Sequence, residues 1–291
     1  MNRVSPGLLA RLEKRLKGRA PAALGALAHP GLDDAPLGQW RPTPAQRAVI
    51  AAARAAPVFR SAARAHAALA LDRLRPGPID ADWHGIRLRH YPRLTSSYRL
   101  MLLAGRRYQA EEFAFLAAHG QGEGAFLDIG ANAGAYSFWA AAAWPGRPVL
   151  AFEPDRALAA ALAQNIRFAG RDIRLFAHAL GAHDGTDAYS PSQESFVAGR
   201  DTVETPVRRL SGVLAEAGIT RVAALKIDVE GWEDRVLAPF LAEAPAALLP
   251  RALLIEHLAR PLWQTDLVPL FRQAGYRTAF TNAHNTGYTR P

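Results

Sequence analysis

The sequence has no cysteine and no long apolar run, and each absence excludes a class of protein. Without cysteine among its 291 residues, the chain can form neither disulfide bonds nor thiolate metal sites. Its apolar stretches fall short of the roughly 18 to 20 residues that a membrane-spanning helix needs. The leucines near the N-terminus are interrupted by basic residues, unlike those of a secretory signal. We therefore expect a cytoplasmic protein without a membrane span.

Basic residues are concentrated in the first part of the chain. The net charge is +9, and residues 1–124 hold 19 Arg and Lys against 9 Asp and Glu, a balance of +10. Residues 125–291 hold 16 against 17, a balance of −1. One interpretation is a basic arm that binds nucleic acid or an anionic membrane. Aromatic residues do not alternate with these charges, as they do on surfaces that stack nucleic-acid bases. We therefore favour the other interpretation, in which the arginines lie on solvated faces, and do not expect a nucleic-acid partner.

Residues 1–107 are expected to form a mainly helical extension that could bind the substrate or a second subunit. Prolines and glycines punctuate residues 1–43, which predicts short helices and irregular connections. Residues 44–75 are rich in alanine and predict one or two helices. Apolar and charged residues partly alternate over 83–91, as in a strand or a hairpin arm. His90, at the edge of that stretch, is interpreted as a surface residue.

Apolar strands alternate with helices from residue 108 onward. Five strands are predicted, at 125–129, 149–152, 173–177, 223–227 and 252–256. Helices are predicted at 109–119, 133–144, 155–168, 211–217, after the fourth strand, and at 262–274. A polar loop is predicted at 181–206 and a closing pair of strands at 276–290. This alternation indicates a parallel sheet covered by helices on both faces.

Four of these strands end in acidic residues, namely Asp128, Glu153, Asp228 and Glu256. In sheets of this class, ligands bind beyond the carboxyl ends of the strands. Packing alone does not account for four carboxylates at corresponding positions. The strand ends therefore predict a ligand site.

The loop Asp128–Gly134, after the first strand, is typical of a nucleoside site. Its glycines allow close approach and a tight turn into a helix whose N–H groups can face a ligand. Its spacing is not the G-x-G-x-x-G of dinucleotide sites, since position 132 is Asn and Asp128 would repel a pyrophosphate. This disfavours a Rossmann oxidoreductase.

S-adenosylmethionine suits this loop better, because it has no phosphate and its sulfonium and ammonium groups favour acidic surroundings. Glu153 lies 23 residues after Gly130, where a carboxylate can accept the hydroxyls of a ribose. In the alternative interpretation, Asp128 and Asn132 are only turn and cap residues. We expect S-adenosylmethionine as the cofactor.

Three sequence blocks together resemble the FkbM family of methyltransferases: "LDIGANAG" at 127–134, "AFEPD" at 151–155 and "LKIDVEGWE" at 225–233. The resemblance covers about residues 105–257. It implies a Rossmann-like class I methyltransferase sheet, mostly parallel with a C-terminal antiparallel strand. The S-adenosylmethionine-binding catalytic domain would then occupy residues 108–291, after the helical extension.

The resemblance also implies which residues bind the cofactor. It assigns the methionine portion to the loop residues Asp128, Gly130, Ala131, Asn132 and Gly134. It assigns the ribose to Glu153, with Pro154 beside it, the edge of the adenine to Ala179 and Leu180, and the amino-acid end to Glu111. The sequence departs from the family pattern at Gln109, Arg209 and Ser211, on the substrate side.

The fourth strand carries Lys226, Asp228 and Glu230 on one face by its period of two. A charged lysine inside a covered strand has to be paired, so we expect a buried ion network with Asp128 and Glu256, and a direct catalytic role is the alternative. Asp228, farther out, is expected to face the transferred methyl group or the substrate.

An alcohol acceptor has to lose a proton, and the candidate groups are Asp228, Glu230 and His257. His257 directly follows Glu256, so only one of those two points toward the pocket if the strand stays regular. Oxygen atoms of Asp228, Glu230 and Glu256 would suit Mg²⁺. No compact spacing supports a metal, and we expect none.

The sequence therefore predicts a methyltransferase that acts on a hydroxyl of a sugar or secondary metabolite. Base-amine methyltransferases often carry an Asn/Asp-Pro-Pro-aromatic segment, which does not follow the fourth strand here. The alternatives are an RNA ribose methyltransferase and a non-catalytic nucleoside-binding protein with a basic docking arm. The acceptor and the oligomeric state stay open.

Overall fold

The computed structural model describes residues 32–56, 61–190 and 202–291, with the backbone alone for 61–65. Predictions for residues 1–31 and 191–201 lie outside this range. The chain divides into two compact units, one of residues up to 109 together with 160–170, the other of 110–159 together with 171–291. Within the described residues, no helix is both long enough and apolar enough to cross a membrane.

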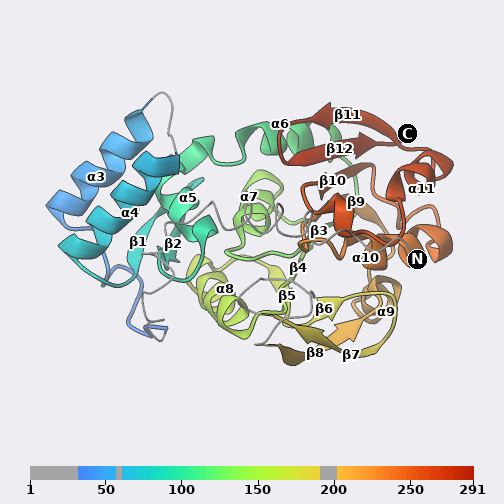
Figure 1. Ribbon diagram of the computed structural model, residues 1–291, viewed down its shortest axis with the longest axis horizontal. Helices are drawn as coiled ribbons and strands as arrows, with labels where there is room; N and C mark the ends of the chain where they lie inside the picture. The colour runs from blue at the N-terminus through green and yellow to red at the C-terminus, as the bar shows by residue number, and fades with distance from the viewer. Residues whose placement is uncertain (1–31, 57–60, 191–201) are drawn as a thin grey trace. The chain divides into compact units, whose positions relative to one another are not determined.

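The first unit contains helices, a hairpin and the second part of α8 (Figure 1). Its elements are α3 (Pro44–Ala55), α4 (Ser61–Leu74), β1 (Ile79–Trp83), β2 (Ile86–His90), α5 (Ser96–Ala104), η1 (Gly105–Arg107) and the 160–170 part of α8 (Arg156–Ala169). Of the one or two helices predicted over 44–75, two form, and the stretch predicted as a strand or hairpin arm is the second strand of a hairpin that begins upstream of it.

The interior of this unit explains why the surface assignment of His90 is wrong. Arg89 is fully buried and forms two hydrogen bonds with Asp80, at 2.8 and 3.0 Å. The side-chain amide of Asn165, on α8, accepts from the Arg89 N–H and donates to its carbonyl. With Arg89 bound on one face of β2, His90 turns inward beside Tyr98 and is 0% exposed.

The second unit is built on a seven-stranded sheet of order β11-β12-β10-β9-β3-β4-β5. Its parallel strands are β3 (Ala125–Ile129), β4 (Val149–Phe152), β5 (Ile173–Phe176), β9 (Val222–Ile227) and β10 (Ala252–Glu256). Two antiparallel strands, β12 (Asn285–Thr289) and β11 (Arg277–Thr281), complete one edge. The predicted α/β fold is confirmed, including its antiparallel C-terminal end.

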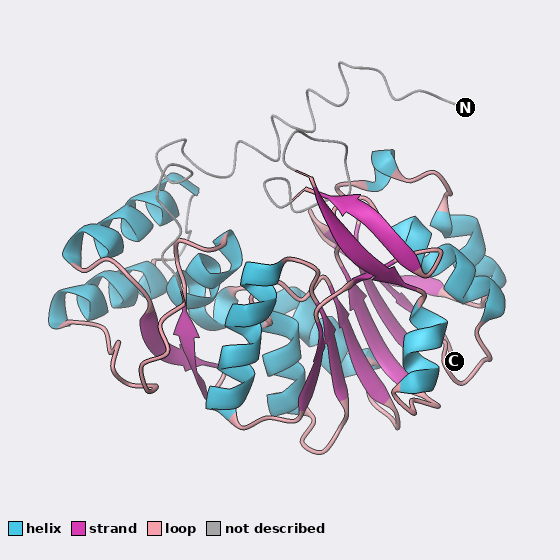
Figure 2. Cartoon of the chain, turned by 90° about the horizontal axis from the view of Figure 1, so that it is seen from below, coloured by secondary structure: helices cyan, strands magenta, loops and turns pink. Residues whose placement is uncertain are grey.

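Helices cover both faces of this sheet (Figure 2). On one face lie α6 (Ala110–His119) and α7 (Ala135–Ala143). On the other, apolar side chains of the strands pack against α9 (Leu210–Glu216), α10 (Glu233–Glu243) and α11 (Leu267–Gln273). The helix predicted at 262–274 is split, because η2 (Arg260–Leu262) ends early and Asp266 caps a new helix.

The prediction of a polar loop over 181–206 is wrong in its described part. This region contributes to a small sheet of order β6-β8-β7, made of β6 (Ala179–Leu180), β7 (Gly185–Tyr189) and β8 (Val203–Arg208). Most of β7 is exposed, so its sequence needs little apolar character. In β8, the buried residues Thr205 and Val207 do alternate with polar positions, a signal obscured by Pro206 between them.

Candidate active site

The four acidic strand ends lie along one edge of the central sheet. Asp128, Glu153, Asp228 and Glu256 lie at or directly after the carboxyl ends of β3, β4, β9 and β10. These strands are consecutive neighbours in the order β10-β9-β3-β4, and all four are parallel. Residues separated by more than 120 positions in the sequence thus meet at one edge, as the sequence predicted.

Asp128 is fully buried at the end of β3. Its Oδ2 accepts hydrogen bonds from the N–H of Ser137, at 2.9 Å, and from the Ser137 hydroxyl, at 2.6 Å, which stabilises the first turn of α7. Its Oδ1 has no hydrogen-bond partner in the described part of the chain. Burial raises the pKa of Asp128, and the nearby Lys226 opposes that change.

Lys226 lies between the carboxylates of Asp128, an expected partner, and Asp228, whereas the expected partner Glu256 groups with Asp228 and Glu233. Its Nζ is 3.9 Å from Asp128 Oδ1 and 3.8 Å from Asp228 Oδ2. It also donates a hydrogen bond of 3.1 Å to the carbonyl of Gly130 and lies 5.1 Å from the ring centroid of Tyr136. The side chain of Asp228 is 33% exposed, whereas those of Lys226 and Asp128 are buried. The network therefore runs from the interior to an accessible carboxylate.

The glycine at position 130 is required by packing between two loops. Gly130 has φ 77°, and a Cβ placed on it would lie 1.8 Å from the carbonyl oxygen of Asp228. The backbone after β9 therefore requires glycine at this position by itself. The predicted close approach of Gly130 to a ligand stays a prediction. Gly134, with φ 78°, begins α7.

Glu153 fixes the loop after β3 from the neighbouring strand. Its Oε2 accepts from the N–H of Asn132 at 2.7 Å, and its Oε1 accepts from the N–H of Asp155 at 2.9 Å. The left-handed conformation of Asn132, φ 51°, turns its N–H toward this carboxylate. Through these two bonds Glu153 connects the loop after β3 with the backbone that follows β4.

The other predicted cofactor residues lie in different environments. Ala131 is buried in the loop, and its N–H donates to the carbonyl of Phe152. Pro154 is half-buried after β4, and Ala179 and Leu180 are the buried residues of β6. No contact in the described residues tests their predicted roles, which stay predictions.

Glu111 is exposed on α6, and its neighbour Glu112 is the buried carboxylate. Glu112 accepts from Asn282 Nδ2 at 2.8 Å and from Asn285 Nδ2 at 3.0 Å, which attaches α6 to the turn between β11 and β12. Glu111 reaches the same Asn282 amide at 3.3 Å. Sequence reasoning missed Glu112, although it precedes the buried Phe115 and Leu116 by three and four residues and therefore lies on the inner face of the helix.

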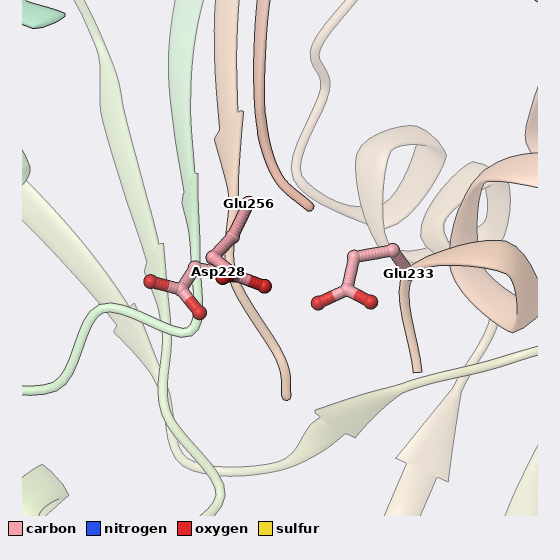
Figure 3. A group of neighbouring side chains, drawn as sticks. All are labelled: Asp228, Glu233 and Glu256. Carbon is pink, nitrogen blue, oxygen red and sulfur yellow. The ribbon is translucent and has the colours of Figure 1, made fainter. Parts of the chain in front are cut away.

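Asp228, Glu233 and Glu256 form a compact acidic group (Figure 3), with one oxygen from each within 4.8 Å of the others. Glu256 is 6% exposed and accepts from the N–H of Leu258 at 2.8 Å. Burial and the nearby carboxylates, Asp228 first, raise the pKa of Glu256 to about 9. At neutral pH its carboxyl group therefore holds a proton.

This acidic group differs from the set considered for a metal. The predicted oxygen ligands were those of Asp228, Glu230 and Glu256, whereas the structure brings Glu233 beside Asp228 and Glu256. Oxygen atoms at this spacing could bind a hard divalent cation. Such an ion would have to displace the proton of Glu256. Glu233 was missed because its helical position gives no signal of the loop contacts that orient it.

The candidate proton acceptors are separated in the structure. Of the adjacent residues Glu256 and His257, Glu256 points toward Asp228. The side chain of His257 points elsewhere, with its Nδ1 2.9 Å from Thr286 Oγ1 on β12. Burial and the neighbouring Arg260 lower the pKa of His257, so its imidazole is neutral at pH 7. Glu230 occupies a left-handed turn after β9, with φ 52°, and is half-buried.

Comparison with known proteins relates most of the second unit to one family. A sequence model of the methyltransferase FkbM domain matches residues 128–278. The 31-O-demethyl-FK506 methyltransferase FkbM of Streptomyces tacrolimicus is 32% identical in a match covering 38% of this chain and 57% of that protein. The chain thus spans just over half of that relative's length.

Two solved structures of methyltransferases match the chain at low sequence identity. The precorrin-6y C5,15-methyltransferase of Geobacter metallireducens is 12% identical, with a TM-score of 0.41, and the match covers 65% of this chain and 91% of that one. The 16S rRNA N2 G1207 methyltransferase of T. thermophilus is 16% identical, with a TM-score of 0.41 and coverage of 73% and 50%.

Proposed function

The chain belongs to the FkbM family of methyltransferases, and on that basis we propose that it transfers a methyl group from S-adenosylmethionine to a hydroxyl of a sugar or secondary metabolite. The observation that carries the proposal is Lys226 between the buried Asp128 and the accessible Asp228 at the strand ends. The name of the curated relative, a 31-O-demethyl-FK506 methyltransferase, supports an oxygen as the acceptor atom.

The residues at the strand ends suit S-adenosylmethionine. Asp128 Oδ1 is a buried acceptor without a hydrogen-bond partner among the described residues, and the carboxylate of Glu153 lies directly after the end of β4, beside the loop after β3. Acidic groups favour the cationic ends of the cofactor, and a carboxylate suits the ribose hydroxyls. We assign Glu153 to the ribose, Asp128 and Asn132 to the methionine portion, and the Leu180 region to the adenine.

The proposed chemistry depends on Asp228. When bound, the cofactor supplies an electrophilic methyl group. Asp228 takes the proton of the acceptor hydroxyl, because its carboxylate is the accessible member of the ion network at the edge of the sheet. Glu256 already holds a proton and therefore does not compete for this one. Lys226, whose Nζ lies 3.8 Å from Asp228 Oδ2, acts by holding Asp228 in place.

Glu230 and His257 are the alternative bases, and a matched set of variants separates the three. We expect Asp228→Asn to reduce methyl transfer by about 100-fold or more, the usual scale of a lost general base. Glu230→Gln and His257→Gln should retain most of the native rate. A larger loss in either of them than in Asp228→Asn would reassign the base.

The test is transfer of an isotopically labelled methyl group from S-adenosylmethionine to a panel of polyhydroxylated small molecules. Products are analysed by mass spectrometry, which shows whether the label is on oxygen. Labelled O-methyl products from the native protein would support the proposal. Label found only on nitrogen or carbon of an acceptor would overturn the assignment to hydroxyl groups.

A further inference from the structure

Glu233, the first residue of α10, is fully buried and surrounded by hydrogen-bond donors. Its Oε1 accepts from the N–H of Val229 at 2.9 Å, and its Oε2 accepts from the N–H of Gly231 at 3.1 Å. Its Oε2 also accepts from the indole N–H of Trp263 at 2.7 Å. One carboxylate thus connects the loop after β9 with the segment that follows η2.

The loop that Glu233 holds has a strained backbone. Glu230 has φ 52° and Gly231 has φ 98°, and the left-handed region is unfavourable for a residue such as glutamate. The hydrogen bonds of Glu233 are formed with the N–H groups on either side of Glu230. On its far side, Gly231 approaches Leu262 so closely that a Cβ would lie 2.8 Å from Leu262 Cδ1.

The same loop begins with Asp228, whose carbonyl group packs against Gly130. The loop is therefore held at its start by the glycine turn after β3 and at its end by Glu233. The side chain of Asp228 starts from the first of these points, and Glu230 lies between the two residues whose N–H groups Glu233 binds. An ionised carboxylate accepts hydrogen bonds and donates none. The three N–H donors around Glu233 therefore favour its ionised form, whereas burial opposes it by raising the pKa of Glu233.

We propose that Glu233 is a positioning residue of the active site, which fixes the loop from Asp228 to Gly231 against Trp263. This inference rests on the proposed function, in which Asp228 takes the acceptor proton and borders the cofactor. Without Glu233 the strained loop adopts other conformations. The fraction of molecules whose loop has the conformation that binds the ligand then falls, and the apparent affinity for a ligand of this loop falls in proportion.

The neighbouring Asp234 provides a matched control. It is also buried at the start of α10, and its Oδ2 accepts from the N–H groups of Gln264 at 2.8 Å and Thr265 at 2.9 Å. Asp234 therefore supports the same segment near Trp263 without a direct bond to the N–H of Val229 or Gly231. Its link to the loop is indirect, through Arg235, whose Nη1 lies 3.2 Å from Asp234 Oδ1 and donates to the Gly231 carbonyl at 3.4 Å. Asp234→Asn should disturb packing near α10 without releasing the loop.

The experiment compares native protein, Glu233→Gln and Asp234→Asn by residue-resolved amide hydrogen exchange, and by calorimetric titration with S-adenosylhomocysteine. In Glu233→Gln the side-chain NH₂ group faces an N–H donor, so the Val229 and Gly231 amides should exchange about tenfold faster or more. S-adenosylhomocysteine should bind about tenfold more weakly. In Asp234→Asn both quantities should stay within about twofold of native.

Exchange of the Val229 and Gly231 amides in the native protein keeps the inference testable even if Glu233→Gln does not fold. Protection well above that of exposed loops is expected, and rapid exchange would overturn it. Equal effects of the two substitutions would also overturn it, because they would indicate a general loss of stability. If S-adenosylhomocysteine does not bind native protein, the proposed function fails, while the exchange comparison still decides whether Glu233 holds the loop.

Discussion

Replacing Lys226 with methionine tests the buried ion network most directly. Methionine keeps most of the length of the lysine stem, so the change removes the charge and the hydrogen bond to Gly130 while largely preserving packing. Asp128 then remains fully buried without the ammonium that lies 3.9 Å away in the native protein. Removing one partner of a buried ion pair costs about 3 to 5 kcal/mol.

Protonation of Asp128 limits this loss and makes it depend on pH. Burial raises the pKa of Asp128, and Lys226 is the strongest influence that opposes the rise. Protonating a carboxyl group with an unfolded pKa near 3.9 costs about 1.36 kcal/mol per pH unit, or about 4 kcal/mol at pH 7 and about 1.5 kcal/mol at pH 5. Burial raises the pKa of Asp128 in the native protein too, so part of this cost is already present there. We therefore expect the variant to lose at most about 4 kcal/mol of unfolding free energy at pH 7, and at most about 1.5 kcal/mol at pH 5.

The sign follows from linkage. A carboxyl group whose folded pKa exceeds its unfolded value destabilises the protein increasingly as pH rises above the unfolded pKa. Urea unfolding at pH 5 and pH 7 measures the difference. The double variant Asp128→Asn with Lys226→Met is the control, and its loss should be the same at both pH values. A loss in Lys226→Met that is below about 1 kcal/mol at pH 7, or that is independent of pH, would refute the reasoning.

Three further predictions concern single residues. Gly130→Ala should lose about 3 kcal/mol or more of unfolding free energy, or fail to fold, because its Cβ would meet the carbonyl oxygen of Asp228. The control Gly146→Ala, with φ 81° and no described atom within 4 Å of the added Cβ, should lose only about 1 kcal/mol. Thermal unfolding measures both losses. Burial lowers the pKa of His90 to about 4, so stability should fall as pH drops from about 6.5 to 4, by up to about 3 kcal/mol, and urea unfolding of His90→Leu should lack that part of the decline. Glu153→Gln should weaken S-adenosylmethionine binding about tenfold, which is about 1.4 kcal/mol, and an unchanged affinity in calorimetry would remove Glu153 from the proposed site.

The sheet and its acidic edge could be predicted because both depend on local patterns. A parallel strand covered on both faces is a short apolar run, and four such runs followed by Asp128, Glu153, Asp228 and Glu256 have to meet at one edge once the sheet forms. The pairing of Lys226 followed from the high free energy of an isolated buried charge. None of these inferences needed the relative positions of distant loops.

The features that were missed depend on contacts between distant segments. The need for glycine at position 130 comes from the carbonyl of Asp228, nearly 100 residues away. Glu233 is oriented by Trp263. His90 is buried because both faces of β2 are covered, with Arg89 bound to Asp80 and His90 beside Tyr98. Each contact is made by tertiary packing, and the local sequence around each residue is compatible with an ordinary surface position.

Calorimetric titration of the native protein with S-adenosylmethionine, S-adenosylhomocysteine and NAD tests the central claim most directly. The acidic strand ends predict saturable binding of the first two with one site per chain, because Asp128 and Glu153 offer acceptors to the ammonium group and ribose hydroxyls that both ligands share, and repel a pyrophosphate. NAD should give no binding heat. Tight binding of NAD, with no response to either of the other two ligands, would contradict the account.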